Sequence, residues 1–354
     1  MLHCTYQKYI LKFRKPGGTS RGILTEKETW FISLYDDENP GRKAWGECGL
    51  FRGLSADDRP GYEEKLKEVC AKLPDQMEGL LPSLKEWPSI HFGIESVLND
   101  WKNGCGQTIF KSDFTEKNIG ININGLIWMG SKEEMLKQIK TKLAEGYQTL
   151  KLKIGAIDFK TELAILKSIR EEYSPKDITI RVDANGAFSP GEAMKKLDRL
   201  AAFDIHSIEQ PINAGQWQEM ALLAEKSPVP IVLDEELIGI HSYEQKKQLL
   251  DTIRPPYIIL KPTLAGGFAG SDEWIKLIEE QGGEWWITSA LESNIGLNAI
   301  AQYTYTKNNP LPQGLGTGQL YTNNIESPLT IKKGKLFLDR GKEWNMDPLI
   351  LLSD

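Results

Sequence analysis

The sequence predicts an α/β protein in which a (β/α)8-type barrel follows a smaller α+β domain. Three observations lead to this prediction. From about residue 119, short apolar segments alternate with amphipathic ones, which is typical of strands and helices in parallel-sheet proteins. Charged residues recur near the ends of the apolar segments at intervals of one βα unit. The 354-residue chain also leaves room for a large domain and a smaller one.

The first domain is expected over residues 1–118. Its predicted strands, which alternate in hydrophobicity, are 3–13, 28–37 and 43–50. The run TSRG between the first two strands is typical of a loop. Helical spacing follows in residues 61–73. Strands followed by helices predict a small α+β domain.

The barrel is expected over residues 119–321. Its eight predicted strands are 120–126, 147–155, 177–185, 205–211, 229–236, 257–263, 284–290 and 312–318. Helical spacing between them is clear in 131–146, 161–173 and 271–282. Eight strands, each but the last followed by a helix, suit a barrel, although a doubly wound open sheet shows the same alternation. Residues 322–354 begin with a predicted hairpin at 328–338 that would return the chain to the first domain.

Polar side chains stand near the carboxyl ends of consecutive predicted strands. They are Lys151, Lys153, Asp183, Glu209, Asp234, Lys261 and Ser289. In a barrel these positions converge on one mouth, where barrel active sites lie, whereas an open sheet would string them along one edge. Their spacing therefore favours the barrel.

Leu150, Leu152 and Ile154 form the apolar face of this strand, which packs on helices. Because side chains alternate along a strand, Lys151 and Lys153 then point into the barrel. An isolated Lys-x-Lys pair is more often the solvated face of an edge strand. Buried ammonium groups need carboxylates nearby or a chemical use for a lowered lysine pKa. The acids on the following strands meet the first condition and favour the interior.

Asp183, Glu209 and Asp234 come from three successive strands and would offer three oxygen donors on one side of the mouth. Any one of them alone would more simply be a helix cap or a surface charge. Oxygen ligands without paired histidine or cysteine favour Mg²⁺, with Mn²⁺ as a substitute, over zinc. The residues that we expect to orient these ligands or pair with a lysine are Asn185, Glu235 and Arg181.

A divalent ion opposite lysines suggests removal of a proton α to a carboxylate. The ion would stabilise the enediolate that forms, while a positioned amine takes the proton. Burial and neighbouring cations lower the pKa of a lysine toward neutrality. Lys151 and Lys261 are the cations expected beside Lys153.

Composition excludes several classes of partner. The net charge is −6 and charges of both signs are interspersed, so we expect neither nucleic acid nor an anionic membrane as partner and instead a small-molecule carboxylate. The four cysteines form no C-x-x-C pair or cluster with histidine, which argues against structural zinc and disulfides. Without an apolar leader or a continuous run of about 18 apolar residues, a cytoplasmic location is expected.

In order and spacing, a set of short motifs resembles the enolase superfamily, in its muconate-cycloisomerase-like subgroup. The motifs are AWGECG (44–49), FGIE (92–95), KLK, VDAN, IEQP, LDEE, LKP and SALES. The resemblance spans nearly the whole chain and implies that the three acids bind Mg²⁺ while Lys153 and Lys261 face each other across the substrate. It also implies that the smaller domain caps the barrel through loops at 17–22 and 50–55.

Within this family, several subgroups do not match. No histidine follows the seventh predicted strand, and 314–320 lacks the D-x-D of dipeptide epimerases and the acid of muconate cycloisomerases. GTSRG and GLGTG resemble the members that dehydrate 2-succinyl-6-hydroxy-2,4-cyclohexadiene-1-carboxylate to o-succinylbenzoate in menaquinone biosynthesis. The resemblance thus implies a lyase of the carbon–oxygen (hydro-lyase) type.

On this resemblance, Lys153 would remove the α-proton and then assist loss of the hydroxyl, while Lys261 would stay charged and stabilise the enediolate. The groups expected to bind the succinyl carboxylate are Ser289, the backbone around Gly316 and Thr317, and Arg21 of the capping loop. The glycine-rich segment is equally compatible with a plain tight turn, and Arg21 with a surface charge.

Two alternatives are compatible with the sequence. Racemisation of N-succinylamino acids, or epimerisation of dipeptides, would use Lys153 and Lys261 as bases on opposite faces. Outside enzymes, TLAGGFAGSDE (263–273) could belong to a nucleotide-binding module, but it matches neither G-x-x-x-x-G-K-[ST] nor G-x-G-x-x-G. A turn between a strand and a helix is the simpler interpretation of that segment.

Overall fold

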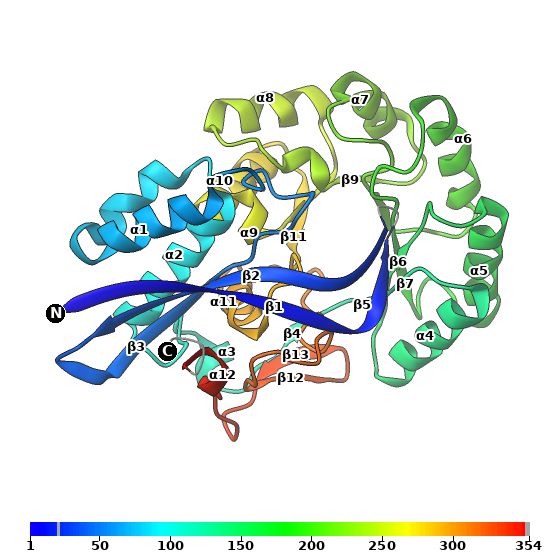
Figure 1. The fold of residues 1–354 in the computed structure, drawn as a ribbon. Helices are drawn as coiled ribbons and strands as arrows, with labels where there is room; N and C mark the ends of the chain where they lie inside the picture. The colour runs from blue at the N-terminus through cyan, green and yellow to red at the C-terminus, as the bar shows by residue number, and fades with distance from the viewer. Residues whose placement is uncertain (20–21, 351–354) are drawn as a thin grey trace.

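The computed structural model describes residues 1–19 and 22–350 and is shown in Figure 1. Its first part is a three-stranded antiparallel sheet in the order β1-β2-β3, with helices on one face. The elements are β1 (Leu2–Thr19), β2 (Gly22–Asp36), β3 (Asn39–Cys48), α1 (Tyr62–Gln76), η1 (Met77–Leu84) and α2 (Pro88–Lys102). The predicted strands and helix of this domain are all present, but β1 and β2 are longer than expected.

Of the loop expected at 17–22, the described residues 17–19 and 22 belong to the paired strands β1 and β2. Gly17 pairs with Leu24, and Gly18 with Ile23, so the two strands run almost to the tip. Their pairing resumes beyond an irregularity after Lys12, which the sequence pattern does not show. In Figure 1 the long β1–β2 hairpin reaches across the barrel, and Gly17 packs against Trp128 of the barrel.

The second half of β2 is buried on both faces, which explains its continuous apolar run. Trp30, Ile32 and Leu34 share one face and join a hydrophobic cluster with residues of α1 and α2. Phe31 points the other way and packs with Ile295 of the barrel. Helix α2 lies very close to β3, since a Cβ at Gly93 would be 2.4 Å from Cys48 Sγ.

Residues from 125 onward form a curled parallel sheet with helices outside it, which confirms the predicted α/β fold class with a separate antiparallel domain. In the described residues this sheet has seven strands that neighbour one another in chain order. They are β5 (Gly125–Ile127), β6 (Thr149–Lys153), β7 (Thr179–Asp183), β8 (Ser207–Glu209), β9 (Ile231–Leu233), β10 (Tyr257–Leu260) and β11 (Glu284–Ile287).

The helices follow the strands in turn, and Figure 1 shows α4 to α8 arranged around the outside of the sheet. They are α4 (Lys132–Ala144), α5 (Phe159–Glu172), α6 (Pro190–Ala201), α7 (Trp217–Lys226), α8 (Tyr243–Ile253), α9 (Pro262–Ala265), α10 (Gly267–Glu280) and α11 (Asn294–Thr306). The short elements are α3 (Asp113–Glu116), β4 (Ile121–Asn122), η2 (Glu235–Leu237), β12 (Leu329–Lys332), β13 (Lys335–Leu338) and α12 (Asp347–Ile350). None of the helices in the described ranges is long and apolar enough to cross a membrane.

The prediction of an eighth strand at 312–318 is wrong in its extent. Only two isolated bridges form there, one between Thr288 and Gly314 and one between Ile123 and Gln313. Gly314 N donates to Ile287 O at 2.8 Å, and Asn124 N donates to Gln313 O at 2.9 Å. These bonds close the ring between β11 and the first strand. Three glycines in seven residues explain why the segment does not extend into a regular strand.

The predicted C-terminal hairpin forms as β12 and β13, but β13 pairs with β4 and not with the first domain. The chain on either side of the hairpin makes the return. Thr322 N donates to Lys12 O at 2.8 Å, and Leu349 packs in a cluster with Phe31. The two largest hydrophobic clusters lie within residues 30–98 and 92–336, while the limits at 118 and 321 stay a prediction.

Candidate active site

The strand-end residues of β6, β7 and β8 meet inside the barrel, as their alternation predicts. Lys151 and Lys153 point inward from β6, and the β6–β7 register places Lys153 beside Asp183. Lys151 Nζ lies 2.9 Å from Asp183 Oδ2 and also donates to Glu209. Lys153 Nζ donates to Asp183 Oδ2 at 2.7 Å.

The other side of the mouth carries a third lysine. Lys261 follows β10 and donates from Nζ to Asp234 Oδ2 at 2.5 Å. Burial alone would lower the pKa of Lys261, but the carboxylates of Asp234 and Glu235 together outweigh burial and raise it. The pKa of Lys151 is raised in the same way, because Asp183 and Glu209 outweigh its burial. Both ammonium groups therefore stay charged as long as they face these carboxylates.

Asp183, Glu209 and Asp234 form a buried cluster whose ligand oxygens lie within 4.8 Å of one another. Burial would raise the pKa of Asp183, but Lys151 and Lys153 hold it well below its usual range. In Glu209 burial dominates and raises the pKa to about 8. These residues fit a divalent cation, since Glu209 Oε1 is buried without a hydrogen-bond partner among the described residues and all the donors are hard oxygens.

Asn185 lies between Lys153 and Asp183, and Glu235 accepts a hydrogen bond from it. Asn185 Oδ1 accepts from Lys153 Nζ at 2.8 Å, and its Nδ2 donates to Glu235 Oε1 at 2.9 Å. Its backbone N–H donates to Asp183 Oδ1 at 3.0 Å. Asn185 thereby fixes the direction of the Lys153 ammonium group.

Arg181 does not orient Asp183, contrary to the expectation from their shared strand face. Its guanidinium stacks on Trp286 at 3.8 Å, and Nη1 donates to Pro312 O at 2.8 Å. The side chain is therefore directed toward the segment that closes the ring. Burial lowers the pKa of Arg181 to about 10.

The three lysines open into a cavity of about 90 Å³ between the two domains. The sequence-predicted residues that line it are Lys151, Lys153, Asn185, Lys261, Ser289, Gly316 and Thr317. Phe51 and Leu54 of the capping loop expected at 50–55 also line it, whereas sequence reasoning missed Leu24, Asn124, Leu126 and Trp128. Trp128 directly follows β5, so the strand-end rule could have found it. Arg21 lies outside the described residues.

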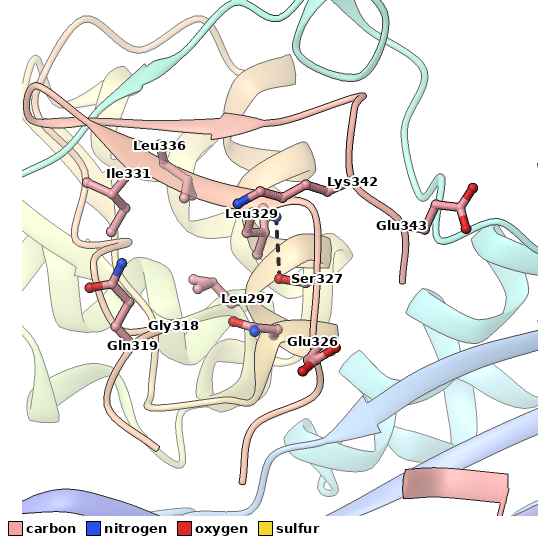
Figure 2. Close-up of a pocket in the computed structure, with 11 residues that line it drawn as sticks. Leu297, Gly318, Gln319, Glu326, Ser327, Leu329, Ile331, Leu336, Lys342 and Glu343 are labelled. Carbon is pink, nitrogen blue, oxygen red and sulfur yellow. Dashed lines mark hydrogen bonds between the residues drawn. The ribbon is translucent and has the colours of Figure 1, made fainter. Parts of the chain in front are cut away.

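Two larger cavities lie elsewhere. One of about 450 Å³ is enclosed by α11, residues 318–319 and the β12–β13 hairpin, and Figure 2 shows Leu297, Leu329 and Leu336 on its walls. The other, of about 800 Å³, is lined by Thr149 and Thr179, which begin β6 and β7, so it lies at the opposite end of the barrel. Neither is lined by Lys151, Lys153 or Lys261, so the small cavity, which all three lysines line, is the candidate active site.

The family model described as "Enolase C-terminal domain-like" matches residues 134–342. The chain belongs to the enolase superfamily. This confirms the family prediction from the motifs, and members of the enolase superfamily depend on a divalent metal ion. The buried acidic cluster is consistent with that dependence.

Among members of the enolase superfamily, an o-succinylbenzoate synthase of Desulfotalea psychrophila is 47% identical and covers 95% of this chain and 98% of its own. A crystal structure of MenC from Desulfotalea psychrophila LSv54 superposes with a TM-score of 0.84 at 43% identity, covering 95% of this chain and 99% of its own. An N-succinylamino acid racemase of Thermus thermophilus is 30% identical over 81% of this chain and 77% of its own.

A muconate lactonizing enzyme of Pseudomonas fluorescens, solved with muconolactone, superposes with a TM-score of 0.79 at 20% identity. It covers 99% of this chain and 98% of its own. At this identity the likeness shows the fold alone. It is the fold expected for the muconate-cycloisomerase-like subgroup.

Proposed function

We propose that the protein is an o-succinylbenzoate synthase, a hydro-lyase that converts 2-succinyl-6-hydroxy-2,4-cyclohexadiene-1-carboxylate to o-succinylbenzoate in menaquinone biosynthesis. The observation that carries the proposal is a pocket in which Lys153 stands beside Asp183 while Lys261 stands beside Asp234. This combination of an amine and metal-binding acids suits the removal of a proton α to a carboxylate. The near-full-length relative at 47% identity supports the substrate.

We assign Asp183, Glu209 and Asp234 as ligands of Mg²⁺, with Mn²⁺ as a substitute. When bound, the ion would stabilise the negative charge that develops on the substrate carboxylate. With its two charges added to those of Lys151 and Lys261, positive charge would exceed the negative charge of the three acids even when Lys153 is a neutral amine. The site is therefore suited to an anionic substrate.

Lys153 is the proposed base. Its amine takes the α-proton, and the resulting ammonium gives a proton to the hydroxyl that leaves as water from the same face. The ring then becomes aromatic, so this half of the reaction is strongly downhill. Asn185 directs Lys153, and Lys261 remains an ammonium opposite it and stabilises the developing negative charge.

The succinyl carboxylate is proposed to lie against residues 314–318. Ala290, Gly316 and Thr317 line the pocket, and their backbone N–H groups donate to no described acceptor. The Ser289 hydroxyl, in contrast, donates to Glu292 at 2.7 Å, so its proton is not available to the substrate. Neutral backbone donors spaced by glycine suit an anion.

Racemisation of N-succinylamino acids is the second candidate. The racemase at 30% identity and the placement of a lysine beside each of two acids favour it. Epimerisation of dipeptides fits less well, because a substrate ammonium group needs an acidic partner. Among the described residues that line the pocket, none is Asp or Glu.

Turnover of the cyclohexadiene carboxylate tests the proposal. Protein stripped with EDTA should be inactive, and added Mg²⁺ should restore the appearance of o-succinylbenzoate in the ultraviolet. A protein that binds Mg²⁺ but gives no product, and that exchanges the α-proton of an N-succinylamino acid in D₂O, would overturn the synthase assignment in favour of the racemase.

We also propose that the enzyme is cytoplasmic. All four cysteines are free thiols in the structure, which suits a reducing compartment. The acidic net charge of −6 gives no basis for nucleic acid as a partner.

A further inference from the structure

A buried carboxylate outside the acidic cluster connects two loops of the pocket. Glu292 is fully buried after β11. Ser289 Oγ donates to its Oε2 at 2.7 Å, and Thr263 Oγ1 donates to its Oε1. Thr263 is two residues beyond Lys261, and Ser289 lines the pocket wall. Glu292 itself is not among the pocket-lining residues.

The hydrogen bonds continue from Ser289 to the glycine-rich segment. Ser289 Oγ accepts from Leu291 N at 2.9 Å and from Thr317 Oγ1 at 2.8 Å. A hydroxyl has one proton and two lone pairs, so all three are in use. A carboxylate only accepts hydrogen bonds. Glu292 therefore fixes the donor direction along the series of hydrogen bonds that runs from Thr317 through Ser289 to Glu292.

A lysine of the first domain faces the same carboxylate. Lys27 on β2 is buried, and its Nζ donates to Gly49 O at 3.3 Å. A Cβ at Gly49 would be 3.0 Å from Glu292 Cγ, so the first domain packs directly on Glu292. Burial lowers the pKa of Lys27, and the negative charges of Glu47 and Glu292 offset only part of that shift. Lys27 is thus the nearby positive charge for these two acids.

Glu47 offers a matched comparison at the same junction. It is also fully buried, and it accepts from Ser293 N and Gly296 N at 2.9 Å each and from Thr29 Oγ1 at 2.7 Å. These partners lie on β2 and at the start of α11, and none of them lines the pocket. Glu47 therefore stabilises the junction without contacting the pocket hydroxyls.

We propose that Glu292 is a positioning residue for the anion-binding wall, and that Lys27 of the capping domain faces its carboxylate and helps to hold it in place. The inference rests on the proposed function, because it requires that residues 314–318 receive a substrate carboxylate. Glu292 touches neither Lys153 nor the acidic cluster. Its loss should weaken binding of the carboxylate arm more than it slows proton removal.

Glu292→Gln is the decisive variant. An amide in place of the carboxylate supplies one acceptor oxygen instead of two, so either Ser289 or Thr263 loses its acceptor. The series of hydrogen bonds that starts at Thr317 is then interrupted. We expect KM for the cyclohexadiene carboxylate to rise about tenfold with kcat within about threefold, equivalent to roughly 1.4 kcal/mol of binding. Lys27→Met should shift KM in the same direction.

Two comparisons separate positioning from general stability. Glu47→Gln should lower Tm as much as Glu292→Gln yet leave KM unchanged. Ser289→Ala combined with Glu292→Gln should raise KM no more than Ser289→Ala alone, because both changes break one chain. An unchanged KM in Glu292→Gln, an equal rise in Glu47→Gln, or additive effects in the double variant would each refute the proposal.

The change in binding of each variant relative to the wild type is also measured as Kd, by titration with o-succinylbenzoate. This measurement does not need turnover. If the wild type racemises an N-succinylamino acid instead, the KM comparison is made with that substrate and the inference stands or falls separately from the synthase assignment. A wild type that binds neither compound overturns both the proposed function and this inference.

Discussion

Lys151 and Lys153 have different surroundings although one residue separates them. Lys151 contacts two carboxylates, those of Asp183 and Glu209. Among the described residues, Lys153 contacts one carboxylate, that of Asp183, and its second partner is the neutral amide of Asn185. An ammonium held by two buried acids gives up its proton reluctantly. The geometry thus favours Lys153 as the base and Lys151 as the counter-charge of the acidic cluster.

Lys153→Ala should therefore remove turnover while leaving the metal site intact. We expect kcat to fall by about 10³-fold, the scale of a lost general base. The affinity for Mg²⁺, measured by titration calorimetry, should change less than about threefold, because Lys151 still balances Asp183. Lys160→Ala, at an exposed position of α5, is the control. Undiminished turnover in Lys153→Ala would show that another group is the base.

At this scale the sequence predicts the residues that sit on strand ends, because the two-residue alternation of a strand fixes which side chains point inward. It does not identify Glu292 or Lys27 as neighbours. They lie in different domains, and their contact depends on how Gly49 packs against the barrel. No local pattern carries that information.

The motif FGIE joins two elements from different domains. Glu95 of α2 accepts hydrogen bonds from Phe268 N and Ala269 N at the start of α10. Burial raises the pKa of Glu95 to about 7. The nearby His91, whose Nε2 lies 3.7 Å away, has its pKa lowered to about 4 by burial and stays neutral above that pH.

The pKa of Glu95, which burial raises although both hydrogen bonds lower it, predicts a pH-dependent stability. A carboxyl whose folded pKa is raised stabilises the fold below its unfolded pKa near 4.5, and this contribution is lost as pH rises through 7. Between pH 4.5 and 8, the free energy of unfolding of the wild type should fall relative to Glu95→Gln by up to about 3 kcal/mol. Urea unfolding at both pH values measures it, with Glu244→Gln on exposed α8 as control. A difference of the opposite sign would refute this role.

The elements predicted best are those with a strict period over many residues, such as α4, α5 and β6. The segment at 312–318, predicted as the eighth barrel strand, and the paired ends of β1 and β2 are predicted poorly. At 312–318 the glycines give no period to follow, and the ring closes through backbone bonds to β11 and Asn124 that depend on the whole barrel. At 17–22 glycine suggested a loop, yet Gly17 and Gly18 pair across the hairpin.

Metal binding should stabilise the entire molecule, because the three acids come from three different strands and the unfolded chain does not bring them together. At Mg²⁺ concentrations about 100 times Kd, the free energy of unfolding should rise by about 2.7 kcal/mol and Tm by roughly 5 °C. Glu209→Gln should lose this shift, whereas Glu326→Gln, at an exposed position, should keep it. A shift that survives in Glu209→Gln would place the ion elsewhere.

Strand β1 forms hydrogen bonds with a residue near the other end of the chain. Lys12 N donates to Asn323 Oδ1, across a separation of 311 residues, and Asn323 Nδ2 donates to Ile10 O. During translation, β1 therefore leaves the ribosome long before its partner exists. The barrel ring likewise closes only after residue 313 is made. Contacts of such long range form late and slowly, so the nascent chain has to stay unaggregated, with its lysines and acids apart, until synthesis is nearly finished.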